Sequence, residues 1–322
     1  MKVLVTGGAG FIGSHVVDSL IDHGHQVVVV DDLSTGKEEN INPEVKFYKM
    51  NIRDPEMERI FTEERPDVLN HHAAQMSVNV SVARPLFDAE VNVLGSLNLI
   101  ELCKKHGVKR FIYISTGGAV YGEPRYLPCD EAHPVDPLSQ YGVTKHTVEH
   151  YLYLYRFNYG LDYIILRYPN VYGPRQDPYG EAGVVAIFTG QMLKGQQVVI
   201  NGDGNQERDF VYIDDVVRAN LIALTIPFSE LRAATKASNG RSDNFVYNLG
   251  SGKGTSVNRI FEELRQIIGY QREPVHGPPR EGEVYKICLE ASKAEKALGW
   301  RPKVGLREGL KKTVAWFEGQ IL

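Results

Sequence analysis

The 322-residue sequence contains few cysteines, and the three that it has, Cys103, Cys129 and Cys288, lie far apart. An odd number of widely spaced thiols gives neither a disulfide framework nor the paired spacing of a zinc site. We therefore expect no metal ligands and three free thiols in a reducing compartment.

Long apolar runs are also missing. No segment approaches the roughly 18 apolar residues that a membrane-spanning helix needs, and the first apolar run, Val3 to Val5, is too short for a secretory signal. The formal net charge of -4 provides no basic face for nucleic acid. These absences predict a soluble, cytoplasmic protein that binds neither membranes nor nucleic acid.

The first half of the chain alternates short β-rich apolar runs with longer segments of helical periodicity. This alternation is typical of a parallel sheet wrapped by helices, so we predict an α/β protein with a doubly wound, Rossmann-type sheet. The expected strands are Lys2–Thr6, Gln26–Val30, Val45–Tyr48, Val68–His72, Arg110–Ser115 and Asp162–Arg167. The expected helices are Phe11–His23, Pro55–Glu63, Pro85–Lys105 and Tyr141–Phe157.

After about Tyr172 the pattern loosens, because glycine, proline and charged residues recur and apolar runs shorten. Only three strands are expected there, over Gln197–Ile200, Phe210–Tyr212 and Phe245–Leu249. We predict a smaller, mixed α/β lobe over residues 173–322, with some segments returning to the first domain. The polar stretch Leu231–Asn244 is expected to be a surface loop.

A glycine motif opens the chain. Gly7, Gly10 and Gly13 follow the first expected strand and begin a helix, whose N-terminus suits a pyrophosphate. Asp31 ends the second strand, where a carboxylate can bond ribose hydroxyls and repel a 2'-phosphate. Residues 1–172 are therefore predicted to form a domain that binds NAD in preference to NADP.

Tyr141 and Lys145 are four residues apart and share one face of an expected helix. A free tyrosine, with a pKa of about 10, is a poor base at neutral pH, but a nearby ammonium group favours the phenolate. Such a tyrosine can take a proton from a hydroxyl while hydride leaves the adjoining carbon.

The segment Ser115-Thr116-Gly117-Gly118 ends an expected strand about 25 residues before Tyr141. Its two hydroxyls either take part in chemistry or bond the backbone at the strand end, as serine and threonine often do. The segment alone does not distinguish these roles.

Together these motifs resemble the extended branch of the short-chain dehydrogenase/reductase superfamily, which includes the nucleotide-sugar epimerases and dehydratases. The resemblance implies NAD as cofactor and an adenine contact at Ile52, with Asn51 in place of a usual aspartate. The residues it implies for cofactor binding are Gly7, Gly10, Phe11, Ile12, Gly13, Asp31, Asp32, Asn51, Ile52, Ala73, Ala74, Asn92, Tyr141 and Lys145.

The run Ser115 to Gly122, STGGAVYG, resembles the epimerases' Ser-Ser-x-x-x-Val-Tyr-Gly. In that family the catalytic hydroxyl lies four residues before the tyrosine, a count that gives Gly117 here. Thr116, Ser115 or a bound water must then fill this role. We predict Thr116, acting with Tyr141 and Lys145 and touching the sugar.

Three later motifs resemble the family's substrate-binding half. They imply sugar contact by Asn170 and a clamp of Arg208 and Arg280 on the substrate diphosphate, which guanidinium groups match in charge and geometry. Ile287, seven residues after Arg280, is the position expected to limit the group at sugar C2.

The resemblance implies NAD-dependent epimerisation at C4 of a UDP-sugar, with UDP-glucose and UDP-galactose as the expected pair and a 4-keto intermediate. It also implies a homodimer formed through the helices near residues 85–105 and 141–157. Alternatives are a 4-epimerase of UDP-N-acetylhexosamines or UDP-uronic acids, another nucleotide-sugar dehydratase or reductase, and a non-catalytic NAD-binding sensor. A 4,6-dehydratase is disfavoured because Gly117-Gly118 offers no carboxylate beside Thr116.

Overall fold

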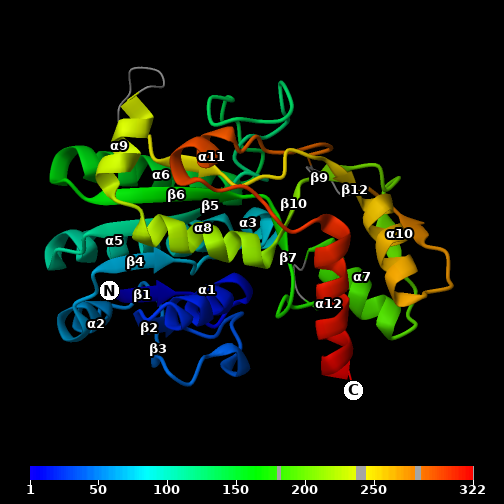
Figure 1. Ribbon diagram of the computed structural model, residues 1–322, viewed down its shortest axis with the longest axis horizontal. Helices are drawn as coiled ribbons and strands as arrows, with labels where there is room; N and C mark the ends of the chain where they lie inside the picture. The colour runs from blue at the N-terminus through cyan, green and yellow to red at the C-terminus, as the bar shows by residue number, and fades with distance from the viewer. Residues whose placement is uncertain (180–182, 237–243, 280–283, 322) are drawn as a thin grey trace.

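The computed structural model describes residues 1–179, 183–236, 244–279 and 284–321. Its centre is a seven-stranded sheet in the order β11-β6-β5-β4-β1-β2-β3 (Figure 1). Every neighbouring pair in this sheet is parallel. Its strands are β1 (Lys2–Thr6), β2 (Gln26–Asp31), β3 (Lys46–Lys49), β4 (Val68–His71), β5 (Arg110–Thr116), β6 (Asp162–Tyr168) and β11 (Val246–Asn248). The predicted doubly wound, Rossmann-type α/β fold is confirmed.

The central strands are nearly continuous apolar runs, as expected for strands covered on both faces. The four valines of β2, for example, are all buried. The chain order reverses at β1, which lies between β2 and β4. Ligands of open α/β sheets bind beyond the carboxyl ends of the strands at such a reversal.

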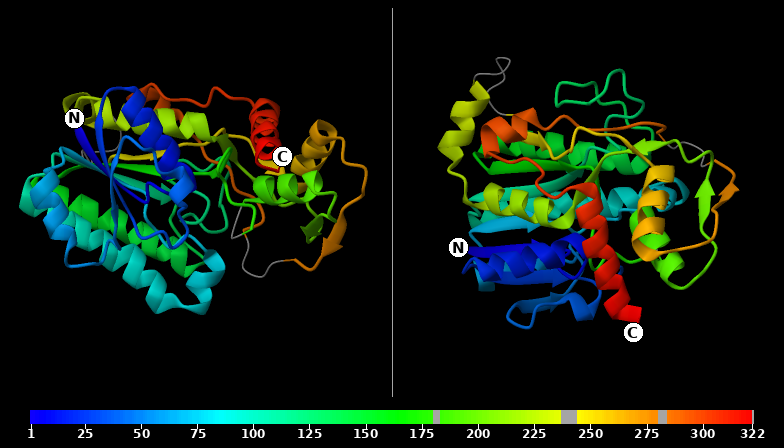
Figure 2. Two further views of the ribbon diagram at one scale, coloured as in Figure 1. Left: turned by 90° about the horizontal axis from the view of Figure 1, so that it is seen from below. Right: turned by 45° about the vertical axis from the view of Figure 1, so that its right-hand side comes forward.

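Helices cover both faces of the sheet (Figure 2). On one face α1 (Phe11–Asp22) packs against α8 (Ile213–Thr225). The opposite face is covered by α2 (Met57–Glu64), α5 (Gly95–His106) and α6 (Gln140–Tyr159). The Ser139 hydroxyl accepts a bond from the Gly142 N–H and caps the N-terminus of α6. This cap places Tyr141 in the first turn of the helix.

The predicted single helix over Pro85–Lys105 is present, with a π-helical segment within it. It consists of α4 (Pro85–Ala89), the π-helical segment η2 (Glu90–Leu94) and α5, and it is preceded by a short helix that was not predicted, α3 (Val78–Ala83). A π-helical turn accommodates one extra residue and is frequent at functional sites. Here it contains Asn92, which is buried.

The later half of the chain packs α7 (Val184–Leu193), α10 (Val257–Ile268) and α12 (Leu306–Ile321) beside the sheet domain, on the right of Figure 1. Short strands pair there: β7 (Asn170–Tyr172) with β10 (Phe210–Tyr212), β8 (Val199–Asn201) with β13 (Val275–Gly277), and β9 (Glu207–Arg208) with β12 (Thr255–Ser256). Two further short helices are η1 (Glu38–Asn40) and α11 (Ser292–Leu298). Two later elements, α8 and β11, return to the central sheet and its helical layer.

The prediction of a surface loop over Leu231–Asn244 was wrong for its first residues, because α9 (Phe228–Lys236) continues through Leu231. Leu231 is fully buried, and the Phe228 ring lies 4.5 Å from that of Phe245. These apolar contacts anchor a helix whose remaining composition is polar. Residues 237–243 of the expected loop lie outside the described part of the chain.

A small apolar cluster joins the segment after β5 to the segment before α11. It consists of Val120, Tyr121, Cys129, Ile287 and Leu289. Within the four described ranges, we find no helix long and apolar enough to cross a membrane.

Candidate active site

The turn between β1 and α1 leaves room for a nucleotide. A Cβ on Gly13 would lie 2.1 Å from the Gly7 carbonyl oxygen, and Gly7 itself has a φ of +71°. The N-terminus of α1, at Gly10, has no side-chain cap and no acidic residue in its first turn. Its free N–H groups fit the pyrophosphate of NAD, because they are donors that the protein leaves unpaired.

The Asp31 carboxylate lies beside this turn, where it accepts bonds from the N–H groups of Ala9 and Leu33 at 3.0 and 2.9 Å. Burial raises the pKa of Asp31, while these two backbone bonds oppose the increase. At the next position, Asp32 accepts a 2.6 Å bond from the Asn51 amide. The two acidic side chains and Asn51 therefore meet at the carboxyl ends of β2 and β3.

The other residues predicted for the cofactor gather along the same edge. A Cβ on Gly7 would lie 2.5 Å from the backbone nitrogen of Ala73, so the turns after β1 and β4 touch. Phe11, Ile12 and Ala74 are partly buried there, and Ile52 is buried against Gly95. Asn92 exchanges 2.9 Å bonds with the backbone N–H and carbonyl of Gln75, so it braces the segment that follows β4.

The predicted catalytic hydroxyls meet at the carboxyl end of β5. The Thr116 side chain lies close enough to the phenol of Tyr141 to lower the pKa of that phenol. Ser115 points elsewhere, because its hydroxyl donates a 2.6 Å bond to Glu149 in the interior. Of the two hydroxyls, only that of Thr116 contacts Tyr141.

Gly117, where the family pattern would place the hydroxyl, has no room for a side chain. A Cβ there would lie 2.3 Å from Leu289 Cδ1, and Leu289 is buried in the apolar cluster after β5. A Cβ on Gly118 would instead make ordinary contacts, 3.7 Å from Asn170 Oδ1 and 3.8 Å from Thr116 Oγ1. Leu289 therefore fills the space that a side chain at position 117 would need.

Lys145 lies one helical turn beyond Tyr141, with its Nζ 4.5 Å from the centre of the Tyr113 ring. Burial lowers the pKa of Lys145 to about 7, although the carboxylates of Glu149 and Asp88 raise it. Burial also raises the pKa of Tyr141 well above its ordinary value, as does Asp88, while the bond to Thr116 lowers it. In this structure Tyr141 is therefore a neutral phenol.

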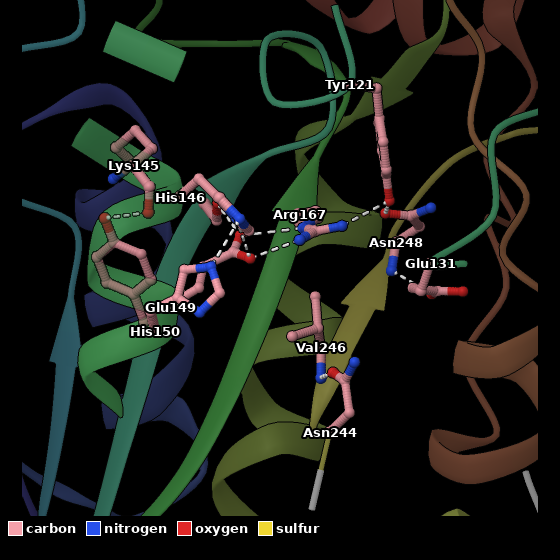
Figure 3. Close-up of polar contacts among 12 residues, drawn as sticks. Tyr121, Glu131, Lys145, His146, Glu149, His150, Arg167, Asn244, Val246 and Asn248 are labelled. Atoms are coloured by element: carbon pink, nitrogen blue, oxygen red, sulfur yellow. Dashed lines mark hydrogen bonds and ion pairs between the residues drawn. The ribbon is translucent and has the colours of Figure 1, made fainter. Parts of the chain in front are cut away.

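A buried ion pair between Arg167 and Glu149 lies next to the site (Figure 3). Arg167 of β6 donates two bonds to the Glu149 carboxylate, at 3.0 and 2.5 Å, and a third to the Tyr121 hydroxyl at 2.8 Å. Burial alone would raise the pKa of Glu149, but Arg167, His146 and Ser115 lower it well below its usual range. The pair therefore links α6, β5 and β6, the elements that carry the catalytic residues. Sequence analysis missed it, although Glu149 follows Lys145 at the same four-residue spacing.

A second buried carboxylate was also missed. Asp88 is fully buried in α4 and accepts bonds from Gln75, from Asn92 and from the Thr144 hydroxyl, at 2.7, 3.0 and 2.8 Å. It joins the segment after β4 to the helix of Tyr141. No local pattern in the sequence distinguishes it from an exposed aspartate near a helix start.

Two of the residues predicted to bind the substrate, Asn170 and Arg208, lie in the short strands β7 and β9. Asn170 begins β7 and faces the turn at Gly118. Arg208 is partly exposed in β9, where it donates bonds to the carbonyls of Glu207 and Tyr285. Arg280 lies outside the described residues. Ile287 is 3% exposed within the apolar cluster, packed with Tyr121.

The adjacent histidines after β4 are packed. The His71 ring contacts the hydroxyls of Thr6 and Ser96 at 2.7 and 2.9 Å, and burial lowers its pKa well below the usual range. In the part of the chain that the structure describes, no three His, Cys, Asp or Glu side chains are grouped closely enough to hold a metal ion.

The arrangement is suited to proton transfer at a hydroxyl-bearing carbon. The Tyr141 phenol lies beside the Thr116 hydroxyl at the carboxyl end of β5, with Lys145 one helical turn further along α6. A protein that only senses NAD would have no need of Tyr141, Lys145 and Thr116 in this arrangement.

The comparisons with known proteins agree with this geometry. The model of the NAD-dependent epimerase/dehydratase family matches residues 3–235. A curated relative from Methanocaldococcus jannaschii, a putative UDP-glucose 4-epimerase, is 48% identical over 98% of both chains. The UDP-glucose 4-epimerase of Thermotoga maritima, solved with UDP-glucose, is 53% identical over the full length of both chains with a TM-score of 0.94. The Thermus thermophilus enzyme of the same name, in complex with NAD, is 45% identical over 99% of both chains with a TM-score of 0.89. The chain belongs to the NAD-dependent epimerase/dehydratase family.

Proposed function

We propose that the protein interconverts UDP-glucose and UDP-galactose by NAD-dependent epimerisation at sugar C4. Full-length relatives of the same fold carry this activity in their names, and one was solved with UDP-glucose. The observation that carries the proposal in this chain is the placement of Tyr141 and Lys145, one helical turn apart on α6, beside Thr116 at the end of β5.

In the proposed mechanism the O4 hydroxyl of the sugar binds at Tyr141 and Thr116. Tyr141 Oη takes the O4 proton and returns it when the sugar has turned over, so it acts as base and then as acid. When bound, oxidised NAD supplies the hydride acceptor for C4 and a positive ring charge that favours the phenolate. The Thr116 hydroxyl positions O4 next to the phenol of Tyr141. The positive charge of Lys145 favours the phenolate. No net oxidation results.

We also propose that the two parts of the chain predicted from the sequence bind different ligands. Residues 1–172 hold NAD along the edge formed by Gly7, Asp31 and Ala73, and residues 173–322 mainly hold the UDP-sugar. Asn170 contacts the sugar, while Arg208 and Arg280 bind its diphosphate. A 4,6-dehydratase remains disfavoured, because Gly117-Gly118 provides no carboxylate beside Thr116 and a side chain at position 117 would have to displace Leu289.

The test is proton NMR of the purified protein with UDP-galactose, first without and then with added NAD. We expect the anomeric signal of UDP-glucose to appear and to approach the same equilibrium from either sugar. UDP-N-acetylglucosamine and UDP-glucuronic acid serve as parallel substrates. Conversion of one of these, and none of UDP-galactose even with NAD, would replace the proposed sugar while leaving the C4 chemistry in place.

We also propose that the protein is a homodimer. Large apolar side chains are exposed on adjoining elements of one face, with Val82 and Leu86 on α3 and α4, Leu94 on η2, and Leu154 and Phe157 on α6. Leu86 and Phe157 are 79% and 74% exposed. Contiguous apolar surface of this kind marks a protein interface. Analytical ultracentrifugation of the wild type and of Leu154→Glu/Phe157→Glu should show a dimer and a monomer.

A cytoplasmic location is the last part of the proposal. All three cysteines are buried free thiols, which suits a reducing compartment. Fractionation of the source cells, followed by detection with an antibody, tests it.

A further inference from the structure

Two histidines on α6 lie together outside the catalytic edge (Figure 3). His146 and His150 are one helical turn apart, with their Nε2 atoms 3.0 Å apart and their ring planes at 74°. His150 is exposed and the His146 side chain is 24% exposed, so solvent reaches the pair. The mechanism proposed above uses neither imidazole.

The distance between the two nitrogens, now that of a hydrogen bond, is close to that of a chelate. Zinc binds imidazole nitrogen at about 2.0–2.1 Å, so two such ligands at the tetrahedral angle lie about 3.3 Å apart. Two histidines four residues apart on one helix face are also the spacing with which zinc proteases hold their metal. The pair therefore needs no rearrangement of the helix to hold an ion.

The protonation pattern supports coordination as well. His146 Nδ1 lies 3.1 Å from the Glu149 carboxylate, which is ionised because Arg167 pairs with it. A carboxylate cannot donate, so Nδ1 of His146 carries a hydrogen, and in the neutral imidazole Nε2 then holds the lone pair. This carboxylate–histidine pairing orients and strengthens histidine ligands in metal sites. His150 now donates to that lone pair, and a proton shift to its own Nδ1 frees its Nε2 as the second ligand.

We propose that His146 and His150 form a binding site for a late first-row divalent cation of the Zn²⁺ type, with Glu149 as the outer partner of His146. Imidazole ligands suit zinc, copper and nickel rather than magnesium or calcium. His150 shares the outward face of α6 with Leu154, so in the proposed dimer the ion takes its remaining ligands from water or from the second copy.

Isothermal titration of the tag-free protein with Zn²⁺ tests the site. We expect saturable binding of one ion per chain, or of one ion per two chains if both copies share it. His150→Ala should weaken the affinity by at least about tenfold, the smallest loss typical even of outer-shell partners. His276→Ala removes another exposed histidine and should leave the affinity unchanged.

Cu²⁺ electron paramagnetic resonance gives an independent readout, since nitrogen hyperfine lines should be present in the wild type and lost in His150→Ala. Circular dichroism and sugar turnover in EDTA establish that each variant is folded. Absence of saturable Zn²⁺ binding, or equal affinity in wild type and His150→Ala, would overturn the proposal.

Discussion

Two glycine-containing turns follow β1 and β5, which lie on either side of β4 in the sheet, and they differ in what fills the space that the glycines leave. After β1, the missing side chain of Gly13 lets α1 approach the Gly7 carbonyl, with both residues in one turn. After β5, the missing side chain of Gly117 is replaced by Leu289, from the far end of the chain. The first turn makes room for a ligand, whereas the second is filled from within the protein, beside the hydroxyl that we propose to be catalytic, that of Thr116.

The largest expected effect comes from the residue that faces the second turn. Tyr141→Phe removes the proton acceptor and should lower turnover of UDP-galactose by about 10²–10⁴-fold, the usual contribution of general acid–base catalysis. NAD should remain bound, because the cradle after β1 is untouched. Absorbance of protein-bound cofactor, measured beside the NMR assay, checks both points. Near-normal turnover would refute the assignment of Tyr141.

The next largest effect concerns the Arg167–Glu149 ion pair, whose carboxylate accepts a bond from Ser115 just before the second turn. Arg167→Met leaves the Glu149 charge buried and unpaired, which should lower the free energy of unfolding by about 3–5 kcal/mol. Adding Glu149→Leu should recover most of that loss, since hydrophobic replacements of buried pairs are often neutral. Urea unfolding followed by circular dichroism measures both. Lys104→Met, at the exposed Lys104–Glu101 pair, is the control and should change stability by less than about 1 kcal/mol.

The space at Gly117 can be tested directly. Gly117→Ser forces a side chain against Leu289 and should lower the free energy of unfolding by about 1–3 kcal/mol, the range for overpacked cores. Adding Leu289→Ala should make the combined loss smaller than the sum of the two single losses. Gly118→Ser is the matched control, because its Cβ makes only ordinary contacts. Equal urea midpoints for the two serine variants would contradict the steric explanation.

A smaller effect concerns acid stability. Glu149 has a folded-state pKa below its ordinary value of 4.5, so its pairing contributes stability above pH 4.5 that is lost as the pH falls below it. The wild type should therefore lose stability relative to Glu149→Leu/Arg167→Met between about pH 5 and pH 2. Urea titrations at several pH values measure this difference. A difference that stays constant with pH would show that the pair does not titrate in this range.

Much of the first turn could be predicted from the sequence, because its interactions are local. The glycines, the strand before them and Asp31 lie within one β-α-β unit, and the structure brings them together as expected. The helix predicted over Pro85–Lys105 is present as an unbroken helical stretch from Pro85 to His106, but periodicity does not report the single extra residue that its π-helical turn at Asn92 accommodates.

The second turn depends on contacts that a local pattern does not contain. Local sequence left Thr116, Ser115 and a bound water as alternatives, and the contacts that bear on them, Leu289 against Gly117 and Glu149 with Ser115, appear only in the structure. Each of these partners belongs to another element of the fold. Spacing alone could have suggested Glu149, at the same four-residue interval from Lys145 as Lys145 from Tyr141, but its partner Arg167 required the sheet.

The central claim is that Thr116 supplies the hydroxyl that Gly117 lacks, and paired rate measurements on Thr116→Val and Ser115→Ala test it most directly. Losing one hydrogen bond of about 1.4 kcal/mol should lower kcat of Thr116→Val about tenfold or more, with Thr116→Ser near the wild-type rate. Ser115→Ala should keep most of the rate, because that hydroxyl bonds Glu149. A normal rate for Thr116→Val, or a larger loss for Ser115→Ala, would contradict the account.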